Sequence, residues 1–405
     1  MNVLLQPSIA HTESFIPISG SKSETNRLLL LQALYPNISL GNTSNSDDSE
    51  VMTKALSGNE TVIDIHHAGT AMRFLTAYFA IQEDREVVLT GSSRMKERPI
   101  KILVDALRQL GANITYEENE GFPPLRIKGS RLSQNRISLP ADVSSQYISA
   151  LLLIAPKLDN GLELLLEGKI TSVPYINMTL ALLKQVGINA TFNENTIIVE
   201  PKPEIAKKTV TVESDWSSAS YFYSIAALSN QGTQITLSSY KQDSFQGDSA
   251  LAAIYESFGV STTYNQNTIT LIKNGSVAAT LDFELNNTPD IAQTIAVTCF
   301  GLGMSCHLTG LHTLKIKETD RLEALQTELQ KLGAAISVTN DSLTLKESPQ
   351  INPGITISTY NDHRMAMAFA PLALKVPIVI EDAGVISKSY PAFWNDLKNI
   401  GFQIT

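Results

Sequence analysis

Two patterns of hydrophobic and polar positions recur along the chain. In the first, an amphipathic stretch ends at a glycine and continues into a polar, Asn-rich segment with alternating apolar residues, as in ALLKQVGINATFNENTIIVE. A glycine just past a helix supplies a left-handed cap, and alternation is typical of a half-buried strand. The pattern therefore predicts a helix and a β-hairpin at five places, with capping glycines Gly111, Gly187, Gly259, Gly333 and Gly401.

The second pattern is a β-rich run, a short polar loop and an apolar helix rich in small residues, as in VTVESDWSSASYFYSIAAL. Six copies align at spacings of 46, 73, 72, 72 and 74 residues, on Arg27, Arg73, Gln146, Ser218, Asp290 and Arg364. A further strand and polar loop link each apolar helix to the glycine-capped helix. The chain is therefore predicted to contain six βαβαββ repeats, of which the first is about 26 residues short.

Six such repeats exceed what one hydrophobic core comfortably holds, so they indicate two domains of three repeats each. We predict an α/β (α+β) fold with one domain at residues 21–213, which holds repeats 1–3. The second domain is expected to combine residues 1–20 with residues 214–405, and so to hold repeats 4–6 and both termini. The last repeat stops at GFQIT without its second hairpin strand, which the N-terminal MNVLLQPS could supply.

Composition and charge limit the class of ligand. Hydrophobic residues make up 43% of the chain and charged residues 18%, which suits a packed core. Lys and Arg number 31 against 40 Asp and Glu, so the net charge is −9. Because binding to nucleic acid needs a broad basic face, no nucleic-acid partner is expected. An anionic ligand would have to be held by a local basic cluster.

The cysteines and the chain's apolar runs indicate the compartment. Cys299 and Cys306 lie in one apolar stretch and are expected to pack in the core, since they match neither a disulfide framework nor a metal site. The N-terminal residues do not resemble a signal peptide, and no apolar run is long enough for a membrane span. We therefore expect a cytoplasmic protein without membrane association, metal or cofactor.

Basic residues gather in the loops that precede the predicted helices. Helix N-termini present free N–H groups and the positive end of the dipole, so they favour phosphate and carboxylate groups. If the repeats direct these ends into one cleft, the cleft should hold a polyanionic ligand. For any single loop, solvent-exposed capping residues are the simpler interpretation. The basic residues concerned are Lys22, Arg27, Arg73, Arg94, Arg98, Lys317, Arg321, Arg364 and Lys388.

Acidic residues mark the candidate catalytic positions. Asp290 follows Pro289 in a predicted first helical turn, at the position where other repeats carry Arg, Gln or Ser. It is placed to accept a proton from a bound hydroxyl, although a first-turn Asp commonly only balances the helix dipole. Glu318 lies between Lys317 and Arg321 at the start of an amphipathic helix. These three residues form either part of the site or a surface array of ion pairs.

The segment YNDHRMAM brings Asp362, His363 and Arg364 together at another helix start. Arg364 offers a guanidinium fork that can bind a carboxylate through two parallel hydrogen bonds, which lysine cannot do. His363 on its own is interpreted as a helix cap or a core histidine. The residues and their spacing predict a two-domain cleft for a small phosphorylated acid, with one base and one or two acids.

Ordered motifs run nearly from end to end of the chain, among them GSKSETNR, AGTAMR, RMKERPI, SSQY, SDWSSASYF, TPDIAQT, KETDRL, NDHRMAM and SKSYPAFW. They resemble those of one family, the 5-enolpyruvylshikimate-3-phosphate synthases, or 3-phosphoshikimate 1-carboxyvinyltransferases. The resemblance implies an inside-out α/β barrel arrangement of two similar domains, each of three βαβαββ units, with helix N-termini facing the interdomain cleft. It also implies transfer of the enolpyruvyl group of phosphoenolpyruvate to the 5-hydroxyl of shikimate 3-phosphate, with release of phosphate.

The resemblance further implies roles for individual residues and a monomeric protein. Asp290 would deprotonate the attacking hydroxyl, Glu318 would protonate the methylene carbon, and Lys388 is the rival for that second step. Lys22 would act in catalysis and contact both substrates. Shikimate 3-phosphate would be bound by Lys22, Ser23, Arg27, Ser144, Ser145, Gln146, Ser172, Asp290 and Lys317. Phosphoenolpyruvate would be bound by Lys22, Gly69, Arg94, Gln146, Arg321, Arg364 and Lys388.

Two alternatives remain open at this point. The sister enolpyruvyl transferase that acts on UDP-N-acetylglucosamine shares the architecture but usually carries a reactive cysteine on a loop, whereas both cysteines here fall in an apolar segment. A non-catalytic sensor of phosphorylated metabolites should lack Asp290, Glu318 or Lys388, and all three are present. One departure from the family pattern is Phe74, which follows Arg73 where proline is usual.

Overall fold

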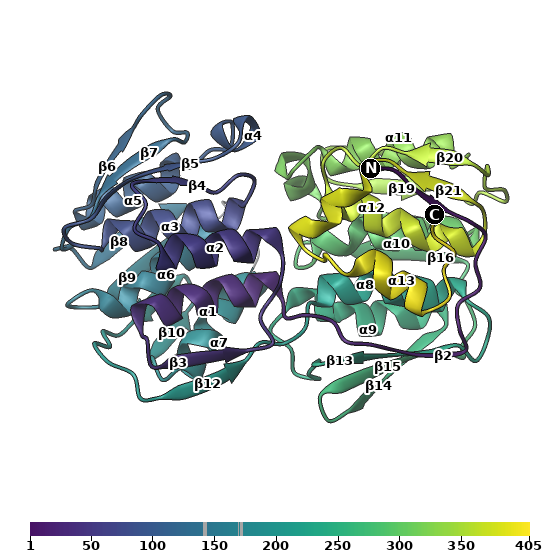
Figure 1. Cartoon of the computed structure of the whole chain (residues 1–405), viewed down its shortest axis with the longest axis horizontal. Coiled ribbons are helices and arrows are strands. Elements are labelled where there is room, and N and C mark those ends of the chain that lie inside the picture. Colours follow the sequence, from purple (N-terminus) through teal and green to yellow (C-terminus); the bar gives the residue numbers. More distant parts are fainter. Residues whose placement is uncertain (141–143, 169, 171–172) are drawn as a thin grey trace. The chain divides into compact units, whose positions relative to one another are not determined.

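The computed structural model describes residues 1–140, 144–168, 170 and 173–405. These residues form two compact units. The terminal unit comprises Met1–Ser19 and Glu213–Thr405, and the central unit comprises Gly20–Val212. Each boundary lies one residue before the position expected from the repeats. Figure 1 marks both ends of the chain in the terminal unit.

Two sheets of the central unit share one topology. In each, the first two strands of the repeat pair in parallel, and an antiparallel hairpin completes the sheet. The second repeat has the order β4 (Val62–Asp64), β5 (Glu86–Thr90), β7 (Leu125–Lys128) and β6 (Asn113–Tyr116). The third repeat has the order β8 (Arg136–Pro140), β9 (Leu162–Glu167), β11 (Thr196–Val199) and β10 (Ala190–Asn193). This arrangement confirms the predicted βαβαββ repeat.

The terminal unit repeats the same arrangement. Its fourth-repeat sheet has the order β2 (Glu13–Ile16), β13 (Gln234–Ser238), β15 (Thr268–Lys273) and β14 (Val260–Asn265). Its fifth-repeat sheet has the order β16 (Thr280–Glu284), β17 (Ser305–Thr309), β19 (Leu343–Leu345) and β18 (Ile336–Val338). The same parallel pair and antiparallel hairpin therefore recur in four full repeats of the described chain.

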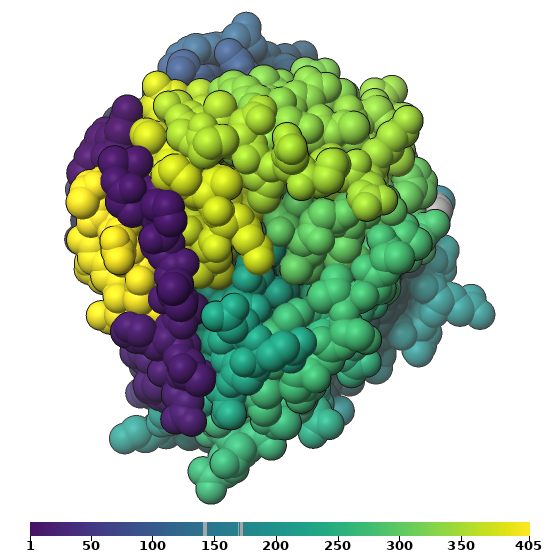
Figure 2. Space-filling view, turned by 90° about the vertical axis from the view of Figure 1, so that its right-hand side faces the viewer, coloured from purple at the N-terminus to yellow at the C-terminus, as the bar shows by residue number. Residues whose placement is uncertain are grey.

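The last repeat is completed by the N-terminus. β20 (Ile355–Ile357) pairs in parallel with β21 (Ile378–Ile380), and β1 (Val3–Leu5) pairs antiparallel with β21. Leu5 also forms a bridge with Ile404. Figure 2 shows the N-terminal segment (purple) lying along the C-terminal residues (yellow). The prediction that MNVLLQPS supplies the missing strand is confirmed.

Two strands are exchanged between the units relative to the sequence repeats. β2 precedes the helix of the first repeat, yet it pairs in parallel with β13 of the terminal unit. β12 (Lys208–Thr211) precedes the helix of the fourth repeat, yet it pairs in parallel with β3 (Ile38–Gly41) of the central unit. The chain changes unit after each of these strands. At Gly20 a Cβ would lie 1.8 Å from the carbonyl oxygen of Asn42, so only glycine fits there.

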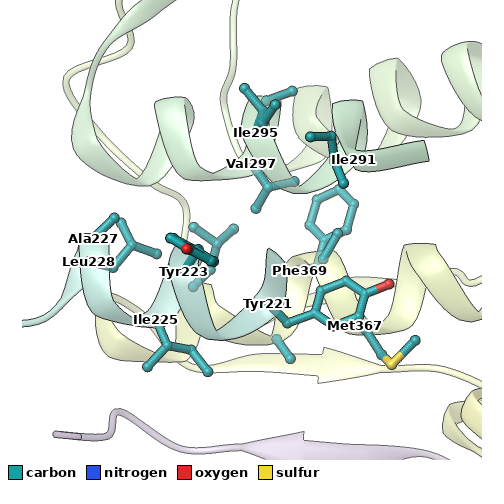
Figure 3. Close-up of a cluster of buried hydrophobic side chains, with 14 of the residues drawn as sticks. Tyr221, Tyr223, Ile225, Ala227, Leu228, Ile291, Ile295, Val297, Met367 and Phe369 are labelled. Atoms are coloured by element: carbon teal, nitrogen blue, oxygen red, sulfur yellow. The ribbon is translucent and has the colours of Figure 1, made fainter. Parts of the chain in front are cut away.

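The apolar helix of each repeat is buried within its unit. In the terminal unit these helices are α8 (Trp216–Leu228), α10 (Ala292–Leu302) and α12 (His363–Phe369), and nearly all of their residues are buried. Figure 3 shows Tyr221 and Ile225 of α8 in one cluster with Ile295 of α10 and Phe369 of α12. Helices that are surrounded on every side need no polar face, which explains their composition.

The central unit buries the corresponding helices in its own core. They are α1 (Lys22–Leu34), α3 (Gly69–Ala80) and α6 (Ser145–Ile154). Shorter or outer helices are α2 (Asp47–Ser57), α4 (Ser93–Lys96), α5 (Lys101–Leu110) and α7 (Val173–Gln185). The N-terminal end of each buried helix follows a polar loop, and some of the predicted site residues, such as Lys22, Gly69 and Arg364, lie at these ends.

The outer helices of the repeats end near the predicted glycines. In the terminal unit these helices are α9 (Leu251–Ile254), α11 (Arg321–Lys331) and α13 (Phe393–Asn399). α9 is a single α-helical turn, which lies between two 3₁₀ turns. All five predicted glycines have a positive φ between 72° and 108°, which confirms the left-handed caps: Gly111, Gly187, Gly259, Gly333 and Gly401.

Two further expectations concern the core and the membrane. Cys299 and Cys306 are both buried, so the predicted core position of the thiols is confirmed. Within the residues that the structure describes, no helix is both long and apolar enough to cross a membrane.

Candidate active site

Asp290 lies at the centre of a charged cluster in the terminal unit. It occupies the 3₁₀ turn Pro289–Ile291, and the proline restricts the backbone where the chain enters α10. One carboxylate oxygen is 2.9 Å from Nη1 of Arg321 and 3.6 Å from Nζ of Lys317. The other oxygen is 3.1 Å from Nη2 of Arg364. The structure thus gathers cations from two separate motifs around one carboxylate.

These neighbours dominate the electrostatics of Asp290. The side chain is only 16% exposed, and burial alone would raise the pKa of the carboxyl group. Arg364, Lys317 and Arg321 outweigh burial and hold that pKa well below its usual range. With these neighbours Asp290 is a carboxylate and a weak base.

Arg321 is the most enclosed cation of the cluster. It is the first residue of α11, whose N-cap Asp320 accepts hydrogen bonds from two backbone N–H groups. Its guanidinium group is 2% exposed and donates to Asp290, to Glu318 at 2.8 Å and to Asp362 at 2.6 Å. Burial lowers the pKa of Arg321, but the three carboxylates raise it by more, so the guanidinium stays charged.

Arg364 approaches Asp290 from the last repeat. Asp362 caps α12 by accepting a hydrogen bond from the N–H of Arg364 at 2.8 Å. Nη2 of Arg364 donates to Asp290 and, at 3.2 Å, to the hydroxyl of Ser217. Its buried Nε has no hydrogen-bond partner within the described part of the chain.

Lys388 lies beside the loop that precedes α12. It ends the 3₁₀ segment Ala383–Lys388, and its Nζ donates to the carbonyl oxygen of Asn361 at 2.6 Å. Asn361 is the chain neighbour of Asp362, which in turn holds Arg321. Lys388 is thus tied to the cluster through the backbone of this loop.

Two neighbours of the cluster were missed by the sequence analysis. Asp248 accepts hydrogen bonds from Ser217 and Thr288, and Ser217 also contacts Arg364. Burial raises the pKa of the Asp248 carboxyl group, although Arg364 opposes this shift. Little in the local sequence indicates these contacts, because they join residues that are far apart in the chain. The position of Asp248 in a short polar loop was the one available hint.

In the central unit, Lys22 and Ser23 occupy the first turn of α1. The N-cap Ser21 accepts a hydrogen bond from the N–H of Glu24. Nζ of Lys22 is 3.3 Å from a carboxylate oxygen of Asp48. The helix N-terminus therefore presents a cation and a hydroxyl side by side, as the sequence predicted.

Arg27 lies deeper in α1 and is only 3% exposed. Its Nε donates to Thr179 at 2.8 Å, its Nη2 to Ser149 at 3.0 Å and its Nη1 to the carbonyl of Ser23 at 2.7 Å. The guanidinium carbon is 5.4 Å from the centroid of the Phe74 ring. Burial lowers the pKa of Arg27 to about 10, so the group remains charged near neutral pH.

Gly69 and Gln146 lie at the starts of α3 and α6. Ser144 caps α6, because its hydroxyl accepts from the N–H of Gln146 at 3.4 Å, and Ser145 is the first helical residue. Nε2 of Gln146 donates to Thr70 at 3.2 Å, directly beside Gly69. The structure therefore brings these predicted residues of the second and third repeats together.

The remaining predicted residues of the central unit are less connected. Arg94 on α4 is half-exposed and forms an ion pair with Glu97 at 2.9 Å. A Cβ at Gly69 would lie 2.4 Å from Nη1 of Arg98, so glycine lets this guanidinium approach the start of α3. Ser172 lies outside the described residues.

The arrangement can hold acidic ligands and move a proton. Cations and hydroxyls lie at helix starts in each unit, and such groups bind phosphate and carboxylate oxygens. In the terminal unit, Asp290 is a carboxylate in reach of the same cations, so it can accept a proton from a group that they orient. Among the described residues, no three His, Cys, Asp or Glu side chains are grouped so as to hold a metal ion.

Solved structures share this fold. The EPSP synthase from Acinetobacter baumannii superposes with a TM-score of 0.81 at 19% identity and covers 100% of this chain and 99% of its own. The enolpyruvyl transferase NikO from Streptomyces tendae superposes with a TM-score of 0.76 at 14% identity and covers 100% of this chain and 98% of its own. The architecture is thus that of enolpyruvyl transferases, an inside-out α/β fold of two similar units.

Sequence comparisons identify the family. A 3-phosphoshikimate 1-carboxyvinyltransferase from Bacteroides fragilis (strain YCH46) is 50% identical over 394 residues, which are 96% of this chain and 95% of that protein. A protein of the same name from Shewanella pealeana is 35% identical over an alignment of 430 positions, which covers 99% of this chain and 100% of that protein. The model of the family EPSP synthase (3-phosphoshikimate 1-carboxyvinyltransferase) matches residues 43–397. This chain belongs to that family, which confirms the resemblance noted from its motifs.

Proposed function

We propose that this protein transfers the enolpyruvyl group of phosphoenolpyruvate to the 5-hydroxyl of shikimate 3-phosphate and releases inorganic phosphate. Membership of the family and the near full-length match to curated relatives support this activity. The structural observation that carries the proposal is the Asp290 carboxylate, which Arg321, Arg364 and Lys317 surround. A carboxylate beside three cations that could hold anionic substrates supports a role for Asp290 as the base.

The proposed reaction proceeds by addition and elimination. Protonation of the methylene carbon of phosphoenolpyruvate leaves an oxocarbenium-like centre at C2, and the 5-hydroxyl oxygen forms a new bond to that carbon. The proton of the hydroxyl passes to Asp290. The tetrahedral adduct then returns a methyl proton to the group that donated it, while the C2–O bond to phosphate breaks and the phosphate leaves with the electron pair of that bond. Proton transfer by positioned groups typically contributes about 10²–10⁴-fold to such a rate.

Two residues are candidates for the proton donor to the methylene carbon. Glu318 is tied to Arg321 at 2.8 Å, next to Asp290. Lys388 donates to the carbonyl of Asn361, so its link to the charged cluster around Asp290 runs through the backbone of the loop that precedes α12. We propose Glu318 for this step and keep Lys388 as its rival. A distinct pH dependence of the two single variants would separate them.

The depressed pKa of Asp290 sets a condition on its role as a base. While three cations contact it, the carboxylate binds a proton weakly. Each substrate carboxylate or phosphate that pairs with Arg321, Arg364 or Lys317 weakens the hold of that cation on Asp290. Ligand binding should therefore raise the pKa of Asp290 and make it a stronger base when both substrates are present.

We assign each substrate to a group of residues, and Lys22 and Gln146 belong to both groups. For shikimate 3-phosphate these are Lys22, Ser23, Arg27, Ser144, Ser145, Gln146, Ser172, Asp290 and Lys317. For phosphoenolpyruvate they are Lys22, Gly69, Arg94, Gln146, Arg321, Arg364 and Lys388. The positions of many of these groups at helix starts support the assignment. Arg27 also donates to the carbonyl of Ser23, so it can act on the substrate through Ser23.

The other proposed properties follow the same assignment. The partners are small molecules, and the net charge of −9 supports the absence of a nucleic-acid partner. We further propose that the protein is cytoplasmic and monomeric. Size-exclusion chromatography of the purified protein tests the proposed monomer.

The test measures phosphate release from phosphoenolpyruvate in three reactions: with shikimate 3-phosphate, with UDP-N-acetylglucosamine and with no acceptor. We expect release only with shikimate 3-phosphate. Release with UDP-N-acetylglucosamine alone would assign the protein to the sister activity. Binding of both substrates by calorimetry without any release would indicate a sensor, and either result would overturn the proposal.

A further inference from the structure

Glu328 is a fully buried carboxylate outside the group of proposed catalytic residues. It lies on α11 seven residues after Arg321, so the two side chains leave nearly the same side of the helix about two turns apart. Lys331 donates to both of its carboxylate oxygens, at 2.8 and 2.7 Å. The N–H of Ser358 donates at 3.1 Å and the hydroxyl of Tyr360 at 2.7 Å. The carboxylate is therefore fully satisfied by hydrogen bonds.

The loop that Glu328 holds has an unusual backbone. Tyr360 and Asn361 are consecutive residues in the left-handed region, with φ values of 54° and 56°. Asparagine tolerates this conformation, but a bulky residue such as tyrosine rarely adopts it. Because Tyr360 is 38% exposed, burial of its ring does not account for the conformation. Its hydrogen bond to Glu328 supplies a contact that compensates for it.

This turn leads directly into the candidate active site. The carbonyl of Asn361 accepts the hydrogen bond from Lys388 at 2.6 Å. The next residue, Asp362, caps the helix that begins with Arg364 and accepts from Nε of Arg321 at 2.6 Å. A change in the backbone at residues 360–361 would therefore move the partners of the Lys388 and Arg321 side chains and the cap that holds the backbone of Arg364.

We propose that Glu328 and Tyr360 are positioning residues that lock the turn at residues 360–361 and so align the cations assigned to phosphoenolpyruvate. This inference rests on the proposed function, since it uses that assignment. Burial and the hydrogen bond to Glu328 raise the pKa of Tyr360 to about 12. The hydroxyl therefore remains a donor at the pH of ordinary assays, and the lock persists.

The test compares the steady-state kinetics of Tyr360→Phe with those of the unchanged protein. The substitution removes only a hydroxyl from a partly exposed side chain, so the protein should fold. We expect the KM for phosphoenolpyruvate to rise about tenfold, as for the loss of one hydrogen bond to a charged acceptor, while the KM for shikimate 3-phosphate changes less than about twofold. Glu328→Gln keeps a carbonyl acceptor and should give a smaller rise with the same selectivity.

Tyr223→Phe is the matched control, because the Tyr223 hydroxyl also makes one hydrogen bond, to Thr262 at 2.7 Å, in the same unit. It should leave both KM values unchanged. An equal rise of both KM values in Tyr360→Phe, or no rise in either, would overturn the positioning role. If the unchanged protein releases no phosphate, the proposed function fails instead, and the two failures are thereby distinguished.

Discussion

Replacing Asp290 with asparagine tests the proposed base with little change in shape. The side chain keeps its size and one carbonyl oxygen, so Arg321 and Arg364 retain an acceptor. The lost negative charge leaves these cations and Lys317 less compensated. Anionic substrates should then bind at least as tightly as before, because the local potential becomes more positive.

The substitution should affect two quantities, the catalytic rate and the free energy of unfolding. Loss of a general base should lower kcat by about 10²–10⁴-fold, which corresponds to roughly 3–5 kcal/mol in the activation free energy. Removing one partner of a buried ion pair typically lowers the free energy of unfolding by about 3–5 kcal/mol. Here the loss should be near the lower end, because Arg321 keeps Glu318 and Asp362 as partners. The protein should therefore stay folded, and the loss of rate should be chemical.

The assay combines phosphate release with equilibrium binding. Calorimetric titration of Asp290→Asn should give a Kd for each substrate no weaker than that of the unchanged protein, while kcat falls by at least about a hundredfold. Thermal unfolding followed by circular dichroism verifies that the variant is folded at the assay temperature. A kcat within about threefold of the unchanged value would exclude Asp290 as the base. Weaker binding of both substrates with unchanged kcat would give it a binding role only.

Three further outcomes are expected. In Arg364→Lys the ammonium group cannot donate to both Ser217 and a substrate carboxylate in the present geometry. The KM for phosphoenolpyruvate should therefore rise about 10- to 100-fold, while the KM for shikimate 3-phosphate stays nearly constant. An equal rise of both KM values would contradict the assignment of Arg364 to phosphoenolpyruvate. Phe74→Ala opens a cavity beside Arg27 and should lower the free energy of unfolding, measured by denaturant titration, by about 3–5 kcal/mol. A decrease below about 1 kcal/mol would show that neighbouring side chains move in to fill the cavity. The pKa of Asp290 is lower in the folded than in the unfolded state, so the carboxylate stabilises the protein fully above about pH 4, and this contribution is lost as the pH falls further. The Tm of Asp290→Asn should therefore fall less steeply below about pH 4 than the Tm of the unchanged protein. Parallel plots of Tm against pH for the two proteins would refute this dependence on the ionisation of Asp290.

Much of the architecture was predictable because it depends on local pattern. The capping glycines follow from the need for a left-handed residue after a helix, and Gly111 and Gly333 confirm it. The apolar helices followed from their composition, since a helix without a polar face must be buried. The pairing of β1 with β21 was predictable from the hairpin strand that the last repeat lacks.

The candidate site was predictable only in part. Lys317, Glu318 and Arg321 lie within five residues of one another, so their proximity was predictable from the sequence. The expected shared helix face is absent, because α11 begins only at Arg321 and the other two residues lie in the segment before it. The contacts of Arg364 with Asp290 and Ser217 join segments that are far apart in the chain. No local pattern specifies such contacts.

The repeat, its capped helices and the residue types at each helix start are encoded locally, because backbone hydrogen bonding and hydrophobic burial impose a periodic pattern of residues along the chain. Three features depend on tertiary packing: the pairing of β2 with β13 and of β12 with β3, the burial of Arg27, and the hydrogen bond between Glu328 and Tyr360. The strand pairings and the burial of Arg27 depend on contacts with residues more than a hundred positions away in the chain. The contact of Glu328 with Tyr360 depends on a turn whose backbone conformation tyrosine rarely adopts. Such pairings follow from how the whole unit packs, so local periodicity carries no trace of them.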